Sequence, residues 1–204
     1  MADEHPKVAQ TEHEVHELIR RRWSPRAFDA HRAVPRDDLL KLFEAARWTP
    51  SSFNEQPWHF VVADRRRTPE VFEALIASLE GRNPAWARSA PVLVLVAVRL
   101  RHASTATENS HAWYDTGQAV ANLTLQATAA GLSIRQMRGF DAEAARAACR
   151  VPPDCIPAVV MAIGHAGDPE TLAHERHRQA EHQPRERRPL SEFVFDGTWG
   201  HPFA

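Results

Sequence analysis

The sequence predicts a single domain of the α+β class, and three features support this prediction. A single core can grow to about 200 residues before chains tend to divide into domains, and this chain has 204. The run 92–98 (Val-Leu-Val-Leu-Val-Ala-Val) is apolar without alternation, which is typical of a central strand covered on both faces. The predicted helices and strands do not alternate strictly, so we do not expect a doubly wound parallel sheet.

Four elements are predicted in the first 81 residues. Thr11 and Glu14 have capping-box spacing, and apolar residues then recur with helical period until about Arg22. Pro35 is suited to the first turn of a second helix, and Thr68-Pro69 to the start of a third. The elements expected here are a helix over 11–22, a helix over 35–49, a strand over 58–62 and a helix over 68–81, which Gly81 closes.

The second half predicts more elements and then a change of composition. In order, we expect the strand 92–98, a mostly buried helix over 115–130 with its stripe at Val120, Leu123, Ala127 and Ala130 and with Gly131 as its cap, a strand over 133–137, a helix over 141–149 and a strand over 156–163. Residues 168–189 are rich in charges and histidines, which indicates an exposed segment. The tail beyond it is apolar again, so a neighbouring subunit is expected to cover it.

Composition excludes several classes of partner. The net charge of −1 gives no global field for nucleic acid or an anionic membrane, so we expect neither as a partner. Cys149 and Cys155 do not form a CxxC pair, which fits a reducing compartment and a packing role. The polar N-terminus lacks the apolar core of a signal peptide, so a cytoplasmic location is expected. The histidines of 174–182 lack the HExxH spacing, and no metal site is predicted.

A basic cluster occupies the segment 22–28 (Arg-Trp-Ser-Pro-Arg-Ala-Phe), directly after the first predicted helix. Arginine is suited to binding phosphate through paired hydrogen bonds, and a second cation can lie against an electron-rich ring carbonyl. The candidate binding residues here are Arg22, Trp23, Ser24 and Arg26. The alternative is a solvated basic helix end that interacts with carbonyl dipoles.

A loop with small polar residues follows the second predicted helix, over 50–57 (Pro-Ser-Ser-Phe-Asn-Glu-Gln-Pro). Small hydroxyl residues let a backbone approach a flat ligand closely, and carboxamides offer donors and acceptors together. The candidate binding residues here are Pro50, Ser51, Ser52, Asn54 and Gln56. The alternative is an ordinary turn that stops the helix.

The two motifs together resemble the signature of the nitroreductase family: Arg-x-Ser-x-Arg-x-Phe, followed about 25 residues later by Pro-Ser-Ser-x-Asn-x-Gln-Pro-Trp. The resemblance extends over roughly residues 14–195. It implies an α+β, nitroreductase-like fold with a central mixed β-sheet flanked by helices, and an intertwined homodimer with a C-terminal arm. It also implies FMN sites at the subunit interface, with the Pro-Ser-Ser loop from one subunit and the arginine motifs from the other.

Two later segments resemble parts of the same flavin site. Asn83, before Pro84, would bind the polar edge of the flavin, although an asparagine in this position is also a common turn former. Residues 131–140 resemble the family's Gly-Leu-Gly stretch and Gly-Phe turn, where main-chain N–H groups approach the reactive flavin nitrogen. The candidate cofactor contacts from this turn are Met137, Arg138 and Gly139.

The segment 185–192 resembles the family's late basic motif before a Pro-Leu step, which completes the phosphate site. A phosphate dianion requires several cations, and the resemblance assigns Arg185 and Arg187, with Arg188 as the alternative by one register. Seen alone, the same stretch would be interpreted as a solvated charge run.

The resemblance implies a flavoprotein oxidoreductase with ping-pong chemistry. NADH or NADPH would supply hydride to the flavin, and a small aromatic acceptor such as a nitroaromatic or a quinone would then take the electrons. No catalytic residue is predicted beyond the flavin contacts, and 100–113 is expected to cover the site. The alternatives are other chemistry on the same flavin (flavin destruction, dehalogenation or dehydrogenation) and a flavin-binding or storage protein without turnover.

Overall fold

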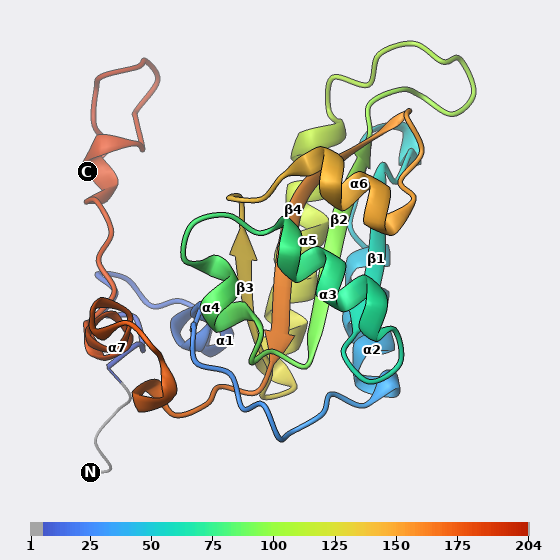
Figure 1. Ribbon diagram of the computed structural model, residues 1–204. Helices are drawn as coiled ribbons and strands as arrows, with labels where there is room; N and C mark the ends of the chain where they lie inside the picture. The colour runs from blue at the N-terminus through green and yellow to red at the C-terminus, as the bar shows by residue number, and fades with distance from the viewer. Residues whose placement is uncertain (1–5, 204) are drawn as a thin grey trace.

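The computed structural model describes residues 6–203 and has a four-stranded sheet between two layers of helices (Figure 1). Residues 1–5 and 204 of the predicted single domain lie outside the described residues. The strands are β1 (Trp58–Asp64), β2 (Val92–Arg99), β3 (Ser133–Met137) and β4 (Cys155–Gly164), in the order β1-β2-β4-β3. The α+β class is confirmed, and the sheet is antiparallel throughout rather than mixed. The connection from β1 to β2 stays at one end of the sheet, and so does the connection from β3 to β4. The two strands of each pair therefore run in opposite directions.

Strand β2 is central, as predicted, and divides its side chains between two cores. Leu93 and Leu95 face the core that includes residues of α3, α4 and α6, whereas Val94 and Val96 face the core that includes residues of α2 and α5. The helices are α1 (Glu17–Arg21), α2 (Arg36–Arg47), α3 (Pro69–Ser78), α4 (Asn83–Ala87), α5 (Ala112–Ala129), α6 (Ala142–Cys149) and α7 (Glu175–His182). Because both faces of β2 are covered, its sequence is apolar without interruption.

The first helix begins later than the capping-box spacing predicts. It starts at Glu17, and the His16 ring accepts the N-cap hydrogen bond from Leu18 N at 3.2 Å. The chain before it folds back instead, because Ala9 N donates to Arg20 O at 2.9 Å. A capping-box spacing is therefore insufficient where a long-range backbone contact competes with the helix.

Two other boundaries and the burial of one residue also differ from the predictions. Helix α5 begins three residues earlier than expected, at Ala112, and Ala130 at its end is exposed rather than part of the buried stripe. Helix α3 ends at Ser78, so Gly81 does not close it but lies beyond it with φ of +62°. The remaining predicted helices and strands are found within two residues of their expected bounds.

The charged segment 168–189 contains helix α7, which the sequence analysis did not predict. This helix is strongly polar, yet Glu181 in its last turn is only 3% exposed. Beyond it the chain extends away from the body as a tail (Figure 1), in which Phe193 is 51% and Trp199 is 91% exposed. Among the described residues, no helix combines the length and the apolar character needed to cross a bilayer.

Candidate functional site

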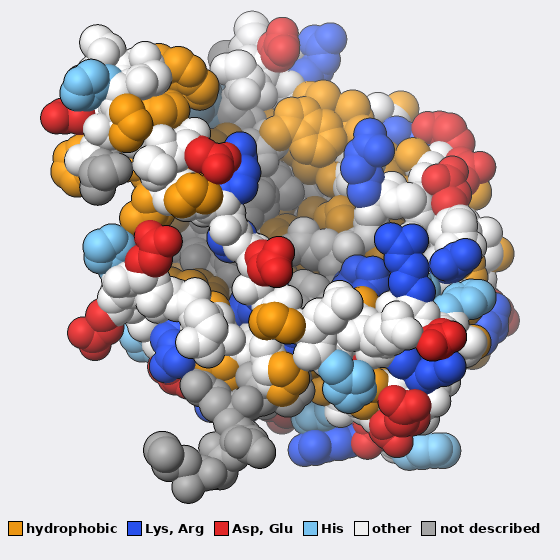
Figure 2. All heavy atoms as spheres, turned by 90° about the vertical axis from the view of Figure 1, so that its left-hand side faces the viewer, with side chains coloured by type: hydrophobic (Ala, Val, Ile, Leu, Met, Phe, Trp, Pro, Cys, Tyr) orange, Lys and Arg blue, Asp and Glu red, His pale blue; other side chains and the backbone are white. Residues whose placement is uncertain are grey.

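A basic pocket of about 210 Å³ lies at the β3 edge of the sheet, between α1, α7 and the start of the tail. We call it the basic pocket, and it is lined by Lys7, Arg22, Trp23, Ser24, Arg26, Arg135, Ala180, Glu181, Arg185 and Arg187. Six of these side chains are cationic and one is a carboxylate. On this face of the molecule, Lys and Arg side chains gather beside a hollow (Figure 2). The structure thus brings the 22–28 cluster and the late basic motif together, as the sequence predicts, within one chain.

Hydrogen bonds to main-chain carbonyls fix the arginines of the basic pocket. Arg185 donates to Arg20 O and Arg22 O, which ties the start of the tail to the end of α1. Arg22 Nη1 donates to Ser24 Oγ at 3.1 Å, and Arg135 Nη1, from strand β3, donates to Ser24 O. A guanidinium has five N–H donors, so these contacts leave further donors for a ligand.

Glu181 holds the turn that carries Arg26. Both of its carboxylate oxygens accept from Arg26 N at 3.1 Å, and Oε2 also accepts from Ala27 N at 3.5 Å. Its Oε1 lies 3.9 Å from Arg26 Nη1. A buried carboxylate requires such partners, so helix α7 and the 22–28 turn are held to one another by this side chain.

The charges of the basic pocket are poorly compensated within the described chain. Burial lowers the pKa of the Arg22, Arg26 and Arg185 guanidinium groups, and neighbouring arginines lower it further, although Glu181 opposes the shift at Arg26. Burial, followed by the charge of Arg26, lowers the pKa of Arg135 to about 10. Arg185 Nε is also buried without a hydrogen-bond partner among residues 6–203. A bound anion would relieve both the repulsion and the unpaired donor, so these residues fit a phosphate group.

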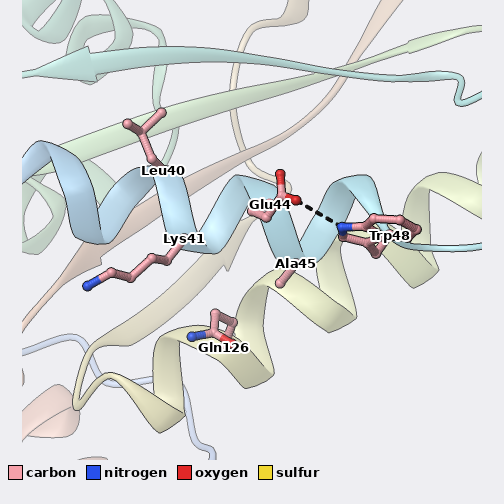
Figure 3. A pocket seen from close by; sticks show the side chains of 6 residues that line it. All are labelled: Leu40, Lys41, Glu44, Ala45, Trp48 and Gln126. Carbon is pink, nitrogen blue, oxygen red and sulfur yellow. Dashed lines mark hydrogen bonds between the residues drawn. The ribbon is translucent and has the colours of Figure 1, made fainter.

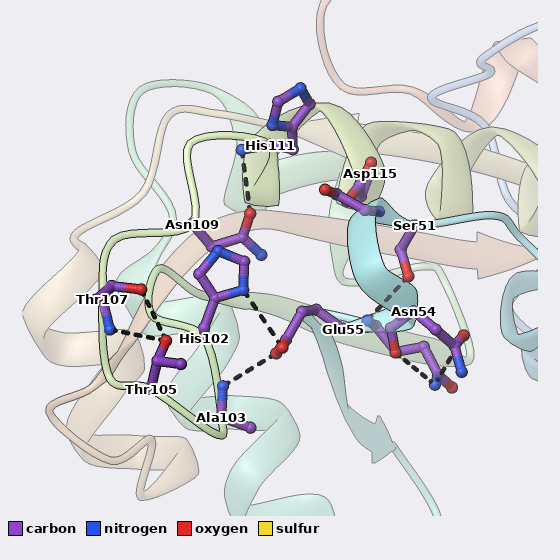
Figure 4. A network of polar contacts seen from close by, with 12 residues as sticks. Ser51, Asn54, Glu55, His102, Ala103, Thr105, Thr107, Asn109, His111 and Asp115 are labelled. Carbon is purple, nitrogen blue, oxygen red and sulfur yellow. Dashed lines mark hydrogen bonds and ion pairs between the residues drawn. The ribbon is translucent and has the colours of Figure 1, made fainter.

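The Pro50–Gln56 loop is strained, and a buried acid on α5 anchors it (Figure 4). Phe53, Asn54 and Gln56 have positive φ values of 51°, 55° and 48°, which cost energy in residues other than glycine and cluster at functional sites. Ser52 N donates to Oδ2 of Asp115, at 3.0 Å, and this carboxylate is only 3% exposed. The loop therefore has a fixed backbone, because Asp115 on α5 supports it.

Within this loop the predicted carboxamides bind one another. Gln56 Nε2 donates to Asn54 O at 3.0 Å and to Asn54 Oδ1 at 3.2 Å, and Gln56 N donates to Ser51 Oγ at 3.0 Å. The exposed Pro50 precedes this network. The polar groups of the loop are thus organised in advance of any ligand.

The segment 100–113, expected to cover the site, contacts this loop in the described chain. Glu55 accepts from Ala103 N at 3.0 Å and lies 3.3 Å from His102 Nδ1 (Figure 4). The Ala103 N–H is the main cause that lowers the pKa of Glu55, and His102 contributes.

The loop and the basic pocket lie at opposite edges of the sheet. Arg135 pairs with Ala162, which pairs with Leu93, which pairs with Ala63, so three strand spacings, about 14 Å, separate Arg135 from strand β1. The loop joins β1 at Trp58, five residues further along, or about 17 Å. One chain therefore does not bring the two halves of the predicted site together.

The turn around Gly139 lies next to the start of α4, so the structure brings two of the predicted flavin-contacting segments together. Asn83 Nδ2 donates to Gly139 O at 3.3 Å, and a Cβ on Gly139 would lie 3.3 Å from the same nitrogen. Met137 is 3% exposed and its side chain belongs to the core, so only its backbone can contact a ligand. Arg138 is exposed beside this turn.

The tail arginines differ in their surroundings. Arg185 and Arg187 line the basic pocket, whereas Arg188 lies 3.7 Å from Glu192 and over the Phe193 ring. The structure also adds residues that the sequence analysis missed, namely Lys7, Arg135, Glu181 and Asp115. Only Asp115 had a signal, as a lone acid in the first turn of a weakly polar helix.

The chain is similar to a known protein family, to a bacterial relative and to a solved structure. The family model described as Nitroreductase family matches residues 19–165. An uncharacterized 15.4 kDa protein in the ask 5' region of Mycolicibacterium smegmatis is 38% identical over 133 residues, covering 65% of this chain and 87% of that protein. The crystal structure of an oxidoreductase containing FMN has a TM-score of 0.89 and 29% identity, covering 98% of this chain and 100% of the other.

A relative whose name states an enzymatic activity matches a shorter segment of the chain. The oxygen-insensitive NADPH nitroreductase of Helicobacter pylori (strain ATCC 700392 / 26695) is 35% identical over 80 residues, which are 39% of this chain and 36% of the enzyme. The chain thus matches about a third of that enzyme's length.

Proposed function

The chain belongs to the nitroreductase family, and from this premise we propose that it is an FMN-dependent oxidoreductase. NADH or NADPH would supply the electrons, and nitroaromatics, quinones or similar small conjugated compounds would accept them in a ping-pong cycle. The observation that carries the proposal is the basic pocket, in which six cations surround one carboxylate and a buried Arg185 donor is unpaired among the described residues. The FMN in the similar crystal structure supports the same cofactor.

Each half of the proposed site would have a separate task. Arg22, Ser24, Arg185 and Arg187 would bind the phosphate of FMN, and Arg26 and Asn83 its polar ring edge. The backbone turn at Gly139 and the fixed Pro50–Gln56 loop would shape the ring cavity and limit water. When bound, FMN supplies hydride transfer and electron transfer, so the chain needs no acid or base of its own for that chemistry.

A homodimer would unite the two halves, with the loop of one subunit beside the basic pocket of the other. Two exposed apolar surfaces support this proposal. The tail carries Phe193 and Trp199. Leu40 of helix α2 and Trp48, directly after this helix, are 54% and 74% exposed and line a hollow to which Gln126 of α5 also contributes (Figure 3). Large exposed apolar groups of this kind mark association surfaces. Residues 168–203 would then form an arm of the single domain that contacts the partner.

Spectroscopy on the purified protein tests the function. We expect the protein to take up FMN, to lose its yellow colour with NADPH or NADH, and to regain it with a quinone or a nitroaromatic. FMN uptake without reduction would favour a storage protein, and reoxidation by neither acceptor would favour other flavin chemistry. A protein that takes up no FMN would contradict the proposal.

Subunit mixing tests the shared site. One variant, Arg22→Ala/Arg185→Ala, disables the basic pocket, and the other, Ser52→Leu, disables the loop. Co-refolded heterodimers of the two would contain one intact site if the halves come from different subunits, so FMN binding would return although neither variant binds alone. Refolded wild-type protein serves as the control. If mixing restores no FMN binding, the proposal of a site shared between subunits is contradicted.

A further inference from the structure

A second basic hollow adjoins the basic pocket and shares Arg26 and Ala180 with it. Its volume is about 610 Å³, and its lining is Arg26, Arg82, Arg176, His177, Gln179, Ala180 and Gln183. None of these lining residues is acidic. Guanidinium and carboxamide groups are donors suited to the oxygens of an anion.

Within the described chain, two arginines that line only the second hollow have side chains without a polar partner. Arg82 precedes α4 and Arg176 lies in the first turn of α7. Both residues are exposed, and their side chains form no hydrogen bond or ion pair with residues 6–203. Arg178, on the same helix, differs because it lies 3.7 Å from Glu170 and donates to Leu172 O. Helix α7 therefore has one arginine with a structural role and one whose donors are available to a ligand.

The cations that line the hollow repel one another, and the carboxylate of Glu181 compensates only Arg26 among the lining residues that the structure describes. Burial lowers the pKa of His177, and the charges of Arg26 and, more weakly, Arg82 lower it further. Burial lowers the pKa of Arg26, the charge of Glu181 opposes this shift, and the neighbouring Arg176 adds a smaller lowering. Binding of an anion would relieve this repulsion.

The arginines are divided between two hollows rather than gathered in one. Arg22, Arg185 and Arg187 line only the basic pocket, and Arg82 and Arg176 line only the second hollow. A phosphate dianion is bound by several cations at short range, so two separate sets indicate two anionic groups. If FMN phosphate occupies the first set, the second set remains for another ligand.

We propose that the second hollow binds an anionic group of the ligand that exchanges at the flavin, and that this group is the 2′-phosphate of NADPH. This inference rests on the proposed function, because it names the electron donor that would bind at the same site. An arginine is the residue type that distinguishes a 2′-phosphate from a hydroxyl. An anionic acceptor would present the same chemistry and is the other source.

Calorimetry with inorganic pyrophosphate tests the hollow without any turnover. FMN-loaded protein should still bind pyrophosphate, and Arg82→Ala/Arg176→Ala should weaken that binding by about tenfold or more, since charge-assisted hydrogen bonds are lost. The matched control Arg66→Ala/Arg67→Ala removes two exposed positive charges elsewhere, on the turn after β1, and should change binding less than about twofold. Equal affinity in all three proteins, or no pyrophosphate binding, would overturn the proposal.

Kinetics then distinguish the two sources of the anion. With an uncharged quinone, the double variant should lose about tenfold in kcat/KM for NADPH and keep kcat/KM for NADH within about twofold. If the loss instead appears only with a nitrobenzoate and not with nitrobenzene, the anionic group belongs to the acceptor. If neither comparison changes, the hollow is not a ligand site. Failure to take up FMN would contradict the proposed function alone, because the difference in pyrophosphate affinity between flavin-free wild-type protein and Arg82→Ala/Arg176→Ala would still report on the second hollow.

Discussion

The basic pocket and the Pro50–Gln56 loop are held in place by different means. The pocket joins segments that are far apart in the sequence, for example when Arg185 donates to Arg22 O and when Glu181 accepts from Arg26 N. The loop is mostly local, and Asp115 is its main distant anchor. The difference indicates that the pocket provides charge and depends on tertiary structure, whereas the loop provides shape and depends on its own strained backbone.

The largest effect should come from removing two arginines of the basic pocket. We expect Arg22→Ala/Arg185→Ala to raise the Kd for FMN by about 10²–10⁴-fold, because two charge-assisted contacts worth roughly 1.5–3 kcal/mol each are lost. Fluorescence titration with riboflavin, which lacks the phosphate, is the internal control and should change much less. An equal loss for both flavins would show that the pair shapes the ring cavity instead, which would remove the contrast between the two regions.

Replacing Asp115 tests the role of the loop, and here FMN and riboflavin should lose affinity together. Asp115→Ala leaves Ser52 N without its buried acceptor, so we expect the free energy of unfolding to fall by about 1–3 kcal/mol and the affinities for FMN and riboflavin to fall together by about tenfold. Urea unfolding and flavin titration measure the two effects. Asp115→Asn keeps an acceptor oxygen and should recover most of both; a loss confined to FMN would contradict the assigned role.

Glu181 separates charge from scaffolding inside the basic pocket. Glu181→Gln keeps an acceptor for Arg26 N but removes the one carboxylate that lines the pocket. We expect FMN to bind about threefold to tenfold more tightly, a gain of roughly 1 kcal/mol, because the phosphate no longer competes with a fixed anion. Glu181→Ala removes the acceptor as well and should lower the free energy of unfolding by about 1–3 kcal/mol. Weaker FMN binding by a stably folded Glu181→Gln protein would refute the proposal that the Glu181 carboxylate repels the FMN phosphate.

The sequence predicts the basic pocket only in part. The 22–28 cluster could be found because its arginines suit anion binding, and the late basic motif could be found because it resembles a motif of the family. The structure unites them. Arg135 could not be found, because a single arginine in a strand has no periodic signal, and Glu181 was hidden in a segment whose charges indicate solvent exposure. Strand β2 was predictable because burial on both faces leaves an uninterrupted apolar run.

Helix α1 and the turn at Met137 show a second limit. Thr11 has the right spacing for a cap, but the contact between Ala9 N and Arg20 O forms only in the folded chain, so local spacing gave the wrong start. Met137 was assigned to the flavin by its place in a motif, yet its side chain lies in the core. Motifs locate a backbone segment, whereas packing decides which side chains remain available.

The smallest effect should appear where the 100–113 segment meets the loop. The pKa of Glu55 is lowered, chiefly by the Ala103 N–H, so the stabilising contact is complete above the ordinary glutamate value of 4.5 and is lost as the pH falls below it, through the folded-state pKa. In a titration from pH 6 to pH 3 by ¹⁵N NMR, the Ala103 amide should therefore shift with a midpoint below 4.5, and Glu55→Gln should abolish that shift.

Affinity for FMN at neutral pH should change less than about twofold in Glu55→Gln, since Glu55 does not line the basic pocket. A midpoint at or above 4.5 would mean that the Ala103 contact does not stabilise the carboxylate. A large loss of FMN affinity in Glu55→Gln would mean that the 100–113 segment contributes to binding through the loop, and the separation between a charge-bearing region and a shape-bearing region would then be too simple.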